Sequence, residues 1–107
     1  MNIRALVRLP ATARPGEVVE VRLLLQHPME TGFRPGADGR IVPRNIVRRI
    51  EARFDGERVF AAELFPAVAA NPYFAFPLRA TKTGTLVVGI EGDNGLAQRE
   101  TAVLTVA

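Results

Sequence analysis

Apolar and polar residues alternate one by one along most of this 107-residue chain, and this pattern constrains the fold more than any other feature. Between residues 19 and 25 every second position is Val or Leu, and between residues 3 and 9 every second position is also apolar. Successive side chains of a strand point to opposite faces, so such a pattern predicts strands with one buried and one solvated face. Helical spacing is not sustained anywhere, and we therefore predict an all-β protein.

Turn residues divide the alternating runs into about seven short strands, a number and spacing typical of immunoglobulin-like sandwiches. Two of the turns, Asp55-Gly56 and Asp93-Asn94-Gly95, carry strong hairpin signals because Gly accepts a positive φ at no steric cost. The predicted strands cover residues 3–9, 19–25, 46–54, 58–60, 74–78, 85–91 and 96–106. We predict one domain over residues 1–107, an immunoglobulin-like β-sandwich of antiparallel strands.

One residue disturbs the third predicted strand. By alternation, Arg48 shares the inward side with Ile46 and Ile50. If this strand lies near a sheet edge, Arg48 can reach an acidic partner; otherwise the register of the strand starts later. Both interpretations stay open at the level of the sequence.

Composition excludes several kinds of chemistry. The chain has no Cys, which leaves no disulfide, thiolate nucleophile or Cys-based metal site, and its single His27 excludes multi-His metal centres. We expect no metal and no cofactor. No window approaches the length of a membrane span, and the alternating start lacks the apolar core of a signal peptide, so we expect the chain itself to encode neither membrane insertion nor export.

The net charge of +3 comes from 14 basic and 11 acidic residues, and the excess lies between residues 34 and 58, which contain seven Arg. A dense cationic surface would suit nucleic acid. However, acidic residues are interleaved through this stretch and Phe54 is its only aromatic residue, so it offers no stacking platform for bases. We therefore predict no nucleic-acid binding.

Catalysis has one weak candidate. His27 and Glu30 lie three residues apart and could in principle form an acid–base pair. A lone His between a strand end and a Pro more often hydrogen-bonds the backbone of its own loop, and Thr12 and Thr31 have no further base to activate them. Neither Asp38-Gly39 nor Asp93-Asn94-Gly95 has the alternating oxygen ligands of a calcium loop. We predict no catalytic and no metal-binding residues.

Two long connections, residues 26–45 and 66–73, interrupt the strand pattern, and we hypothesise that they form a surface for protein partners. Met29 and Tyr73 would be its apolar anchors, and Glu30, Arg34 and Arg44 its specificity charges. The candidate partner-binding residues are His27, Met29, Glu30, Arg34, Arg44, Asn71 and Tyr73. In the alternative, the polar residues of residues 26–45 tie this loop to itself by hydrogen bonds. The isomer of the Asn71-Pro72 bond is also open.

The same connections carry a family resemblance. The run His27-Pro-Met-Glu-Thr-Gly-Phe-Arg34, followed by Ile41-Val-Pro-Arg-Asn-Ile-Val47 and by Asn71-Pro72-Tyr73, resembles the SoxZ family, subunits of the SoxYZ carrier complex of thiosulfate oxidation. Further matches at Gly56 to Phe60 and at Asp93 extend the resemblance over essentially the whole chain.

The resemblance implies a non-catalytic subunit that pairs with a SoxY subunit, whose flexible Gly-rich C-terminal arm carries sulfur intermediates on a Cys. The absence of Cys here agrees, because this chain cannot hold the sulfur itself. The resemblance also implies other Sox enzymes as transient clients, a homodimer when the chain is expressed alone, and a periplasmic location reached by co-export with a partner that bears a twin-arginine signal. The competing interpretation is an immunoglobulin-like interaction module with no role in sulfur chemistry.

Overall fold

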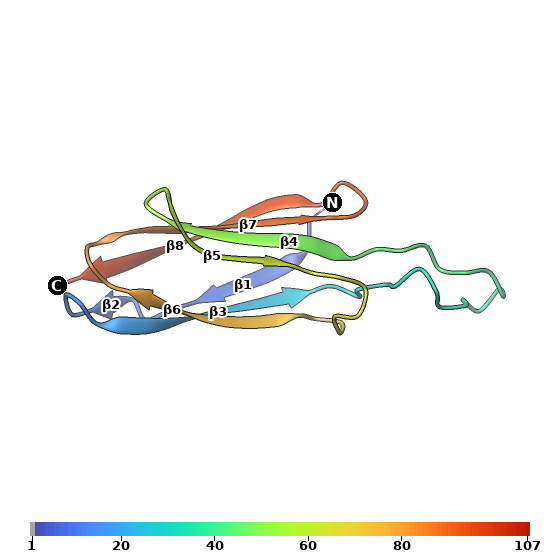
Figure 1. Ribbon diagram of the computed structural model, residues 1–107, viewed down its shortest axis with the longest axis horizontal. Coiled ribbons are helices and arrows are strands. Elements are labelled where there is room, and N and C mark those ends of the chain that lie inside the picture. Colours follow the sequence, from blue (N-terminus) through green and yellow to red (C-terminus); the bar gives the residue numbers. More distant parts are fainter. Residues whose placement is uncertain (1) are drawn as a thin grey trace.

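The computed structural model describes residues 2–107 as two β-sheets packed face to face (Figure 1). The three-stranded sheet has the order β1 (Arg4–Arg8), β3 (Val18–Gln26), β6 (Tyr73–Arg79). The five-stranded sheet has the order β2 (Thr12–Ala13), β8 (Ala97–Val106), β7 (Gly84–Gly92), β4 (Val47–Phe54), β5 (Glu57–Glu63). No helix occurs among these residues, and the predicted immunoglobulin-like β-sandwich is confirmed.

Strand β2 was not predicted, and its pairing is the exception to the antiparallel expectation. Its two residues run parallel to the end of β8, with Thr12 opposite Thr105 and Ala13 opposite Val106. A two-residue strand is too short to show any periodicity in the sequence, and its pairing partner lies at the far end of the chain. The sandwich therefore has eight strands rather than seven among the described residues, one pairing of which is parallel.

The alternating apolar rows form the core as predicted. In β3 the side chains of Val19, Val21, Leu23 and Leu25 are all buried, while the residues between them are exposed. The five-stranded sheet contributes Ile50, Leu86, Val88, Ile90 and Leu104, and β6 contributes Phe76 and Leu78. Phe60 stacks on Phe76 at a centroid distance of 4.5 Å, which joins β5 to β6 across the two sheets.

Both predicted hairpins occur at their turn residues. Asp55 and Gly56 have φ of 48° and 86°, and Asn94 and Gly95 have φ of 59° and 76°. Positive φ at both central residues is the mark of the type I′ turn, whose twist matches that of the flanking strands. Asp55 also accepts a hydrogen bond from the N–H of Thr85 (2.8 Å), which ties this turn to the start of β7.

Arg48 points outward because the register of β4 shifts between Val47 and Arg49. The irregularity puts Val47 in the core with no exposure, whereas the Arg48 side chain is 55% exposed and reaches Asp93. A β-bulge inserts one extra residue into a strand, so the alternation of inward and outward side chains after the bulge is offset from the alternation before it. The structure combines parts of both open interpretations: the regular alternation of β4 begins only after Arg48, and the Arg48 guanidinium has an acidic partner in Asp93.

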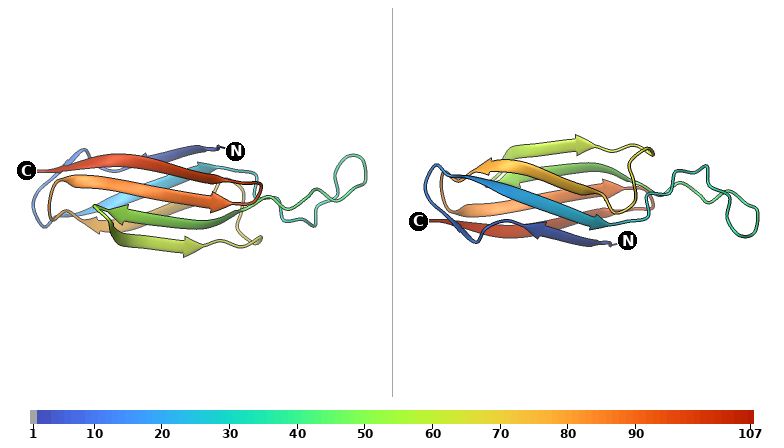
Figure 2. Two further views of the ribbon diagram at one scale, coloured as in Figure 1. Left: turned by 90° about the horizontal axis from the view of Figure 1, so that it is seen from above. Right: turned by 90° about the horizontal axis from the view of Figure 1, so that it is seen from below.

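The connection between β3 and β4 leaves the sandwich and projects from one end of it (Figures 1 and 2). The molecule measures 57 × 20 × 19 Å, with a radius of gyration of 16.1 Å. A compact domain of about 100 residues has a radius of gyration of about 13 Å. The projection therefore sets the shape of the molecule. No helix that could cross a membrane is found among residues 2–107.

Candidate functional site

The projection is a narrow two-stranded ribbon, and we call residues 30–45 the arm. Its base is closed by a pair of backbone hydrogen bonds between Glu30 and Asn45, at 2.8 and 2.9 Å. A second bridge pairs Pro35 with Ile41 close to the tip. The long connection that the sequence marked as irregular thus has its own antiparallel pairing, although it is too sparse to count as regular strands.

His27 lies at the root of the arm and is buried, with only 2% of its surface exposed. Its Nδ1 accepts a hydrogen bond from the N–H of Met29 (3.0 Å), which requires an unprotonated Nδ1. Burial lowers the pKa of His27, and the nearby Asn45 side chain and the Asp93 carboxylate oppose this effect only in part. His27 is therefore a neutral residue that shapes the turn into the arm.

Asn71 ties the second long connection to the same place. Its side-chain Oδ1 accepts a hydrogen bond from the backbone N–H of His27 (3.0 Å), and its own N–H donates to the His27 carbonyl (2.8 Å). The backbone of Asn71 has a φ of 52°, a conformation that Asn tolerates better than most residues. The Asn71-Pro72 bond is trans. The two connections singled out in the sequence therefore meet at one end of the sandwich.

Met29 is a core residue, with 4% of its surface exposed, and so does not lie on the surface as an apolar anchor must. It has a φ of 51°, and its Sδ accepts a hydrogen bond from the N–H of Val47 (3.3 Å). A Met fills irregular space in a core, which fits a turn that packs under the arm. Like His27, Met29 can influence a partner only through the shape of the arm, which corrects its expected role in direct contact.

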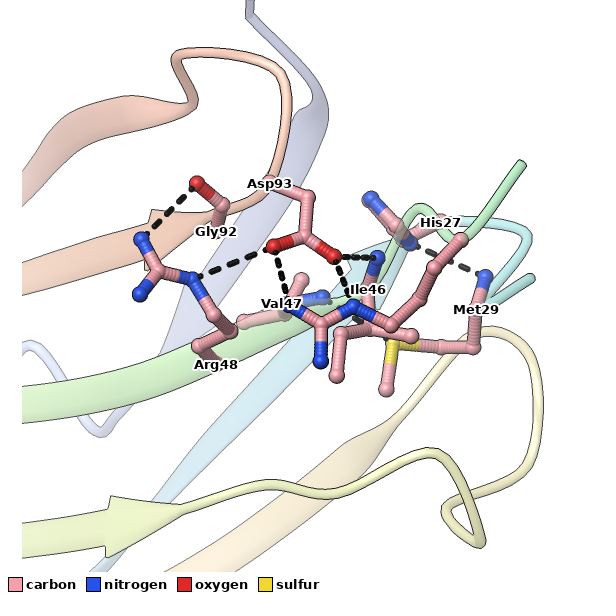
Figure 3. A network of polar contacts seen from close by, with 8 residues as sticks. His27, Met29, Ile46, Val47, Arg48, Gly92 and Asp93 are labelled. Carbon is pink, nitrogen blue, oxygen red and sulfur yellow. Dashed lines mark hydrogen bonds and ion pairs between the residues drawn. The ribbon is translucent and has the colours of Figure 1, made fainter. Parts of the chain in front are cut away.

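Asp93 is the centre of a polar cluster that holds the arm to the β7–β8 hairpin (Figure 3). Arg44 donates to both of its carboxylate oxygens, at 2.8 and 2.9 Å, the bidentate geometry that suits a guanidinium. The N–H of Ile46 donates at 3.2 Å, and Arg48 completes the cluster with an ion pair of 3.3 Å. We call these four residues the Asp93 clamp.

The electrostatics of the clamp favour the ionised carboxylate. Only 14% of the Asp93 side chain is exposed. Burial by itself would raise the pKa of Asp93, but the hydrogen bonds from Arg44 and the Ile46 N–H, together with the charges of Arg44 and Arg48, hold it below its usual value. Sequence reasoning found Arg44 but treated Asp93 as a turn residue. The two lie 49 positions apart, so no local pattern indicates their pairing.

Glu30 and Arg34 pair with each other along the arm. The Arg34 guanidinium donates from Nη2 at 2.7 Å and from Nε at 3.0 Å to the two oxygens of Glu30. The hydrogen bond from Arg34 lowers the pKa of Glu30, and the same bond raises that of Arg34. His27 and Glu30 are each bonded to other groups, and no hydrogen bond among the described residues joins them into an acid–base pair. The polar residues thus make the internal ties that the alternative interpretation expected, while their role toward a partner stays a prediction.

Tyr73 begins β6 on the outer face of the three-stranded sheet and is 54% exposed. Its strand partner is Leu24, which is in turn opposite Leu6, and these two are 39% and 42% exposed. The three side chains form an apolar row next to the root of the arm. Tyr73 is therefore placed where an anchor for a partner can act, and its role stays a prediction.

Chemically, the site offers ion pairs and exposed apolar surface. Among residues 2–107 no group of three or more His, Cys, Asp or Glu side chains is placed to hold a metal ion. The hollow beside the arm has a volume of about 330 Å³ and is lined by charged residues, including Arg44, Arg48 and Glu63, together with the exposed ring of Phe65. Such an arrangement is suited to recognition of a protein surface.

Comparisons with known proteins place this architecture in a family. The family model described as "Sulphur oxidation protein SoxZ" matches residues 7–103. A search of curated protein sequences finds no match.

Among solved structures, the chain is similar to the sulfur carrier protein SoxY from Chlorobium limicola f thiosulfatophilum, with 19% identity, a TM-score of 0.69, and coverage of 96% of this chain and 78% of that one. It is also similar to a superoxide reductase (neelaredoxin) from Ignicoccus hospitalis, with 18% identity, a TM-score of 0.74, and coverage of 98% and 82%. At these identities the likenesses concern the fold alone.

Proposed function

Because the chain belongs to the SoxZ family of sulphur oxidation proteins, we propose that it is a non-catalytic subunit of a sulfur-carrier complex and pairs with a Cys-bearing subunit of the SoxY type. The observation that carries the proposal is the family match over residues 7–103 in a chain that has no Cys. Without a thiol this subunit cannot bind sulfur intermediates covalently, so the partner must supply the Cys. The role left to this chain is to stabilise the carrier and to contribute to its docking surfaces.

The structure supports a binding role in two ways. The only histidine is buried and engaged with backbone, and the carboxylates next to it are held by Arg side chains, so the arm end contains no free acid–base pair among the described residues. The same end brings together the two connections that carry the family motif. We place the partner-facing surface there, with Tyr73 as an apolar anchor and Glu30, Arg34 and Arg44 as charges that orient the partner.

Two further features belong to this proposal. Enzymes of the same oxidation pathway act as transient clients of the assembled carrier, and they react with the sulfur held by the partner rather than with this chain. The compartment that goes with this function is the periplasm, reached by co-export with a signal-bearing partner. Cell fractionation of the native host, with antibodies against both subunits, tests this location. Recovery of the chain in the cytoplasmic fraction alone would contradict it.

The proposal is tested by co-expression with the SoxY-type protein of the same genome. We expect a one-to-one complex in size exclusion with mass detection that persists from low to high salt. Intact mass spectrometry after incubation with thiosulfate and the pathway enzymes should show added sulfur on the partner subunit and an unchanged mass for this chain. A chain that stays separate from the partner at both salt concentrations would return it to the immunoglobulin-like modules without a sulfur role.

A further inference from the structure

The arm has two chemically different faces. Pro35 and Ile41 form a closely spaced antiparallel pair, because the flanking backbone groups hydrogen-bond across the ribbon, Val42 N–H to Arg34 at 2.8 Å and Gly36 N–H to Arg40 at 2.7 Å. In such a ribbon, opposite residues and residues two positions apart share a face. The face of Pro35 and Ile41 is therefore extended by residues 33 and 43 to the set Phe33, Pro35, Ile41 and Pro43.

This apolar face is open to solvent. Phe33 is 81% exposed and Ile41 is 55% exposed, and both prolines are exposed as well. No charged residue belongs to the face. Arg34 and Arg44 lie on the opposite face of the ribbon. The Arg44 Cβ lies close to Gly32, as expected if residues 32 and 44 are opposite each other on that face. Both guanidinium groups are paired with carboxylates, Arg34 with Glu30 and Arg44 with Asp93. The arm thus presents four adjacent apolar side chains that its own sandwich does not cover.

The arm is also held in position, although a two-stranded ribbon of this length is marginally stable in water by itself. The Asp93 clamp fixes its base to the β7–β8 hairpin, and the Glu30–Arg34 pair braces the ribbon. The turn into it is set by the buried His27. A binding element that is already ordered loses less conformational entropy when it binds. Contiguous exposed apolar surface on an ordered element is typical of an interaction site.

We propose that this face of the arm is the main anchor of the permanent subunit interface, and that it inserts into an uncharged, apolar recess on the Cys-bearing partner. The inference rests on the proposed function and adds the location and chemistry of its interface. Permanent interfaces are apolar, with aromatic residues enriched and charges depleted at the core, and the arm face matches this composition. Since the face has no charge, it fits a recess without charge and offers no electrostatic steering toward transient clients. The hollow at the root of this chain's own arm contains five charged side chains beside its four apolar ones, so it matches an uncharged apolar face less well than a recess without charge does.

The test compares the double variant Phe33→Ala/Ile41→Ala with the matched control Val103→Ala. Val103 is 61% exposed on the outer face of the five-stranded sheet, away from the arm. All three positions are exposed, so the melting temperature of the isolated chain should stay unchanged. We expect the double variant to weaken binding to the SoxY-type partner by about 30-fold or more, as truncation of buried anchors does, and the control to bind like the wild type.

The outcomes separate the two proposals. If the wild-type chain does not bind the partner, the proposed function fails. If the wild type binds and the double variant binds equally well, the proposed function stands and the proposed interface at the arm is wrong. In that case, loss of binding in Tyr73→Ala would place the interface on the three-stranded sheet. A wild-type homodimer that persists in the presence of the partner and that the double variant dissolves would show that a second copy is the occupant, which also overturns the inference. As a second measurement, amide hydrogen exchange in residues 30–45 should slow when the partner binds, and unchanged exchange there would contradict it.

Discussion

At the scale of single residues, Asp93 and Arg44 show how one ion pair can position a whole segment. The carboxylate is mostly buried and accepts three hydrogen bonds, and Arg48 adds an ion pair, so its partners are fixed in direction as well as in distance. An exposed pair of this kind contributes little, but bidentate geometry and a sheltered carboxylate raise the contribution. We therefore expect Arg44 to stabilise the arm internally, in addition to the orienting role proposed for its charge.

Arg44→Ala should lower the free energy of unfolding by about 1 kcal/mol, because Asp93 keeps the Arg48 ion pair and the Ile46 hydrogen bond while it loses the bidentate pair. Urea unfolding followed by circular dichroism measures the effect. Arg40→Ala is the matched control, since Arg40 is exposed at the arm tip and makes no ion pair among the described residues. Unchanged stability together with weaker partner binding would assign Arg44 to the interface instead of the clamp.

His27 gives the chain a pH dependence that can be attributed to one side chain, because it is the only histidine. Burial lowers the pKa of His27 in the folded state, so below the ordinary pKa of about 6.5 the unfolded state binds a proton that the folded state resists. Stability should therefore be full above about pH 6.5 and fall as the pH drops toward 5. A single histidine can change the number of bound protons by at most one, so the free energy of unfolding can fall by at most about 1.4 kcal/mol per pH unit.

The measurement is a series of urea unfolding curves between pH 5 and 8, about the range in which histidine titrates. In His27→Asn the side-chain oxygen can still accept the Met29 N–H, but no group titrates at this position. The variant should lose the decline between about pH 6.5 and 5 whatever its absolute stability. An identical slope in wild type and variant would show that the folded state does not discriminate between the two forms of His27.

At the scale of elements, the parts that the sequence predicted are those with local signals. Strand β3 follows from alternation, and the turns at Asp55-Gly56 and Asn94-Gly95 follow from the need for positive φ. The parts that it missed depend on distant pairing: the two-residue β2 against the end of β8, the register shift at Arg48, and the choice of Asp93 as partner of Arg44. The long connection was recognised as unusual, but its projection away from the sandwich could not be predicted, because nothing in the local pattern says what a loop packs against.

Asn71 joins the two long connections, and the contribution of its side-chain hydrogen bond to stability can be measured separately from the strain of its positive φ. Asn71 and Asn94 both have positive φ, 52° and 59°, but only the Asn71 side chain makes a hydrogen bond among the described residues, to the His27 N–H. Asn→Ala at either site incurs the strain of a positive φ, and Asn71→Ala also leaves a donor of a buried residue without its partner. We expect Asn71→Ala to cost about 1 kcal/mol more than Asn94→Ala in denaturant unfolding. Equal losses would mean that the side-chain bond contributes nothing.

At the scale of the whole molecule, the sandwich contains the hydrophobic core, and the arm is the part that we propose for recognition of the partner. Fifteen of the twenty residues of the buried apolar core lie in the strands, and the arm contributes none of them between residues 31 and 44. The length of 57 Å against a width of 20 Å arises because the arm does not return to the core (Figure 2). An element that gives so little to the core should be removable without loss of the fold.

Residues 31–44 can be replaced by Asn-Gly, because Glu30 and Asn45 already face each other as a backbone-bonded pair, and Asn-Gly is the preferred two-residue closure of such a pair. The shortened chain should unfold cooperatively with a melting temperature a few degrees lower, since Asp93 loses Arg44 while it keeps Arg48 and the Ile46 N–H. Small-angle X-ray scattering should show a radius of gyration that falls from the wild-type value toward that of a compact domain, about 13 Å.

If the wild type itself already scatters as a compact particle, the arm lies against the sandwich in solution and its apolar face is covered. If the shortened chain is compact and folded but still binds the SoxY-type partner at full strength, the permanent interface belongs to the sheets.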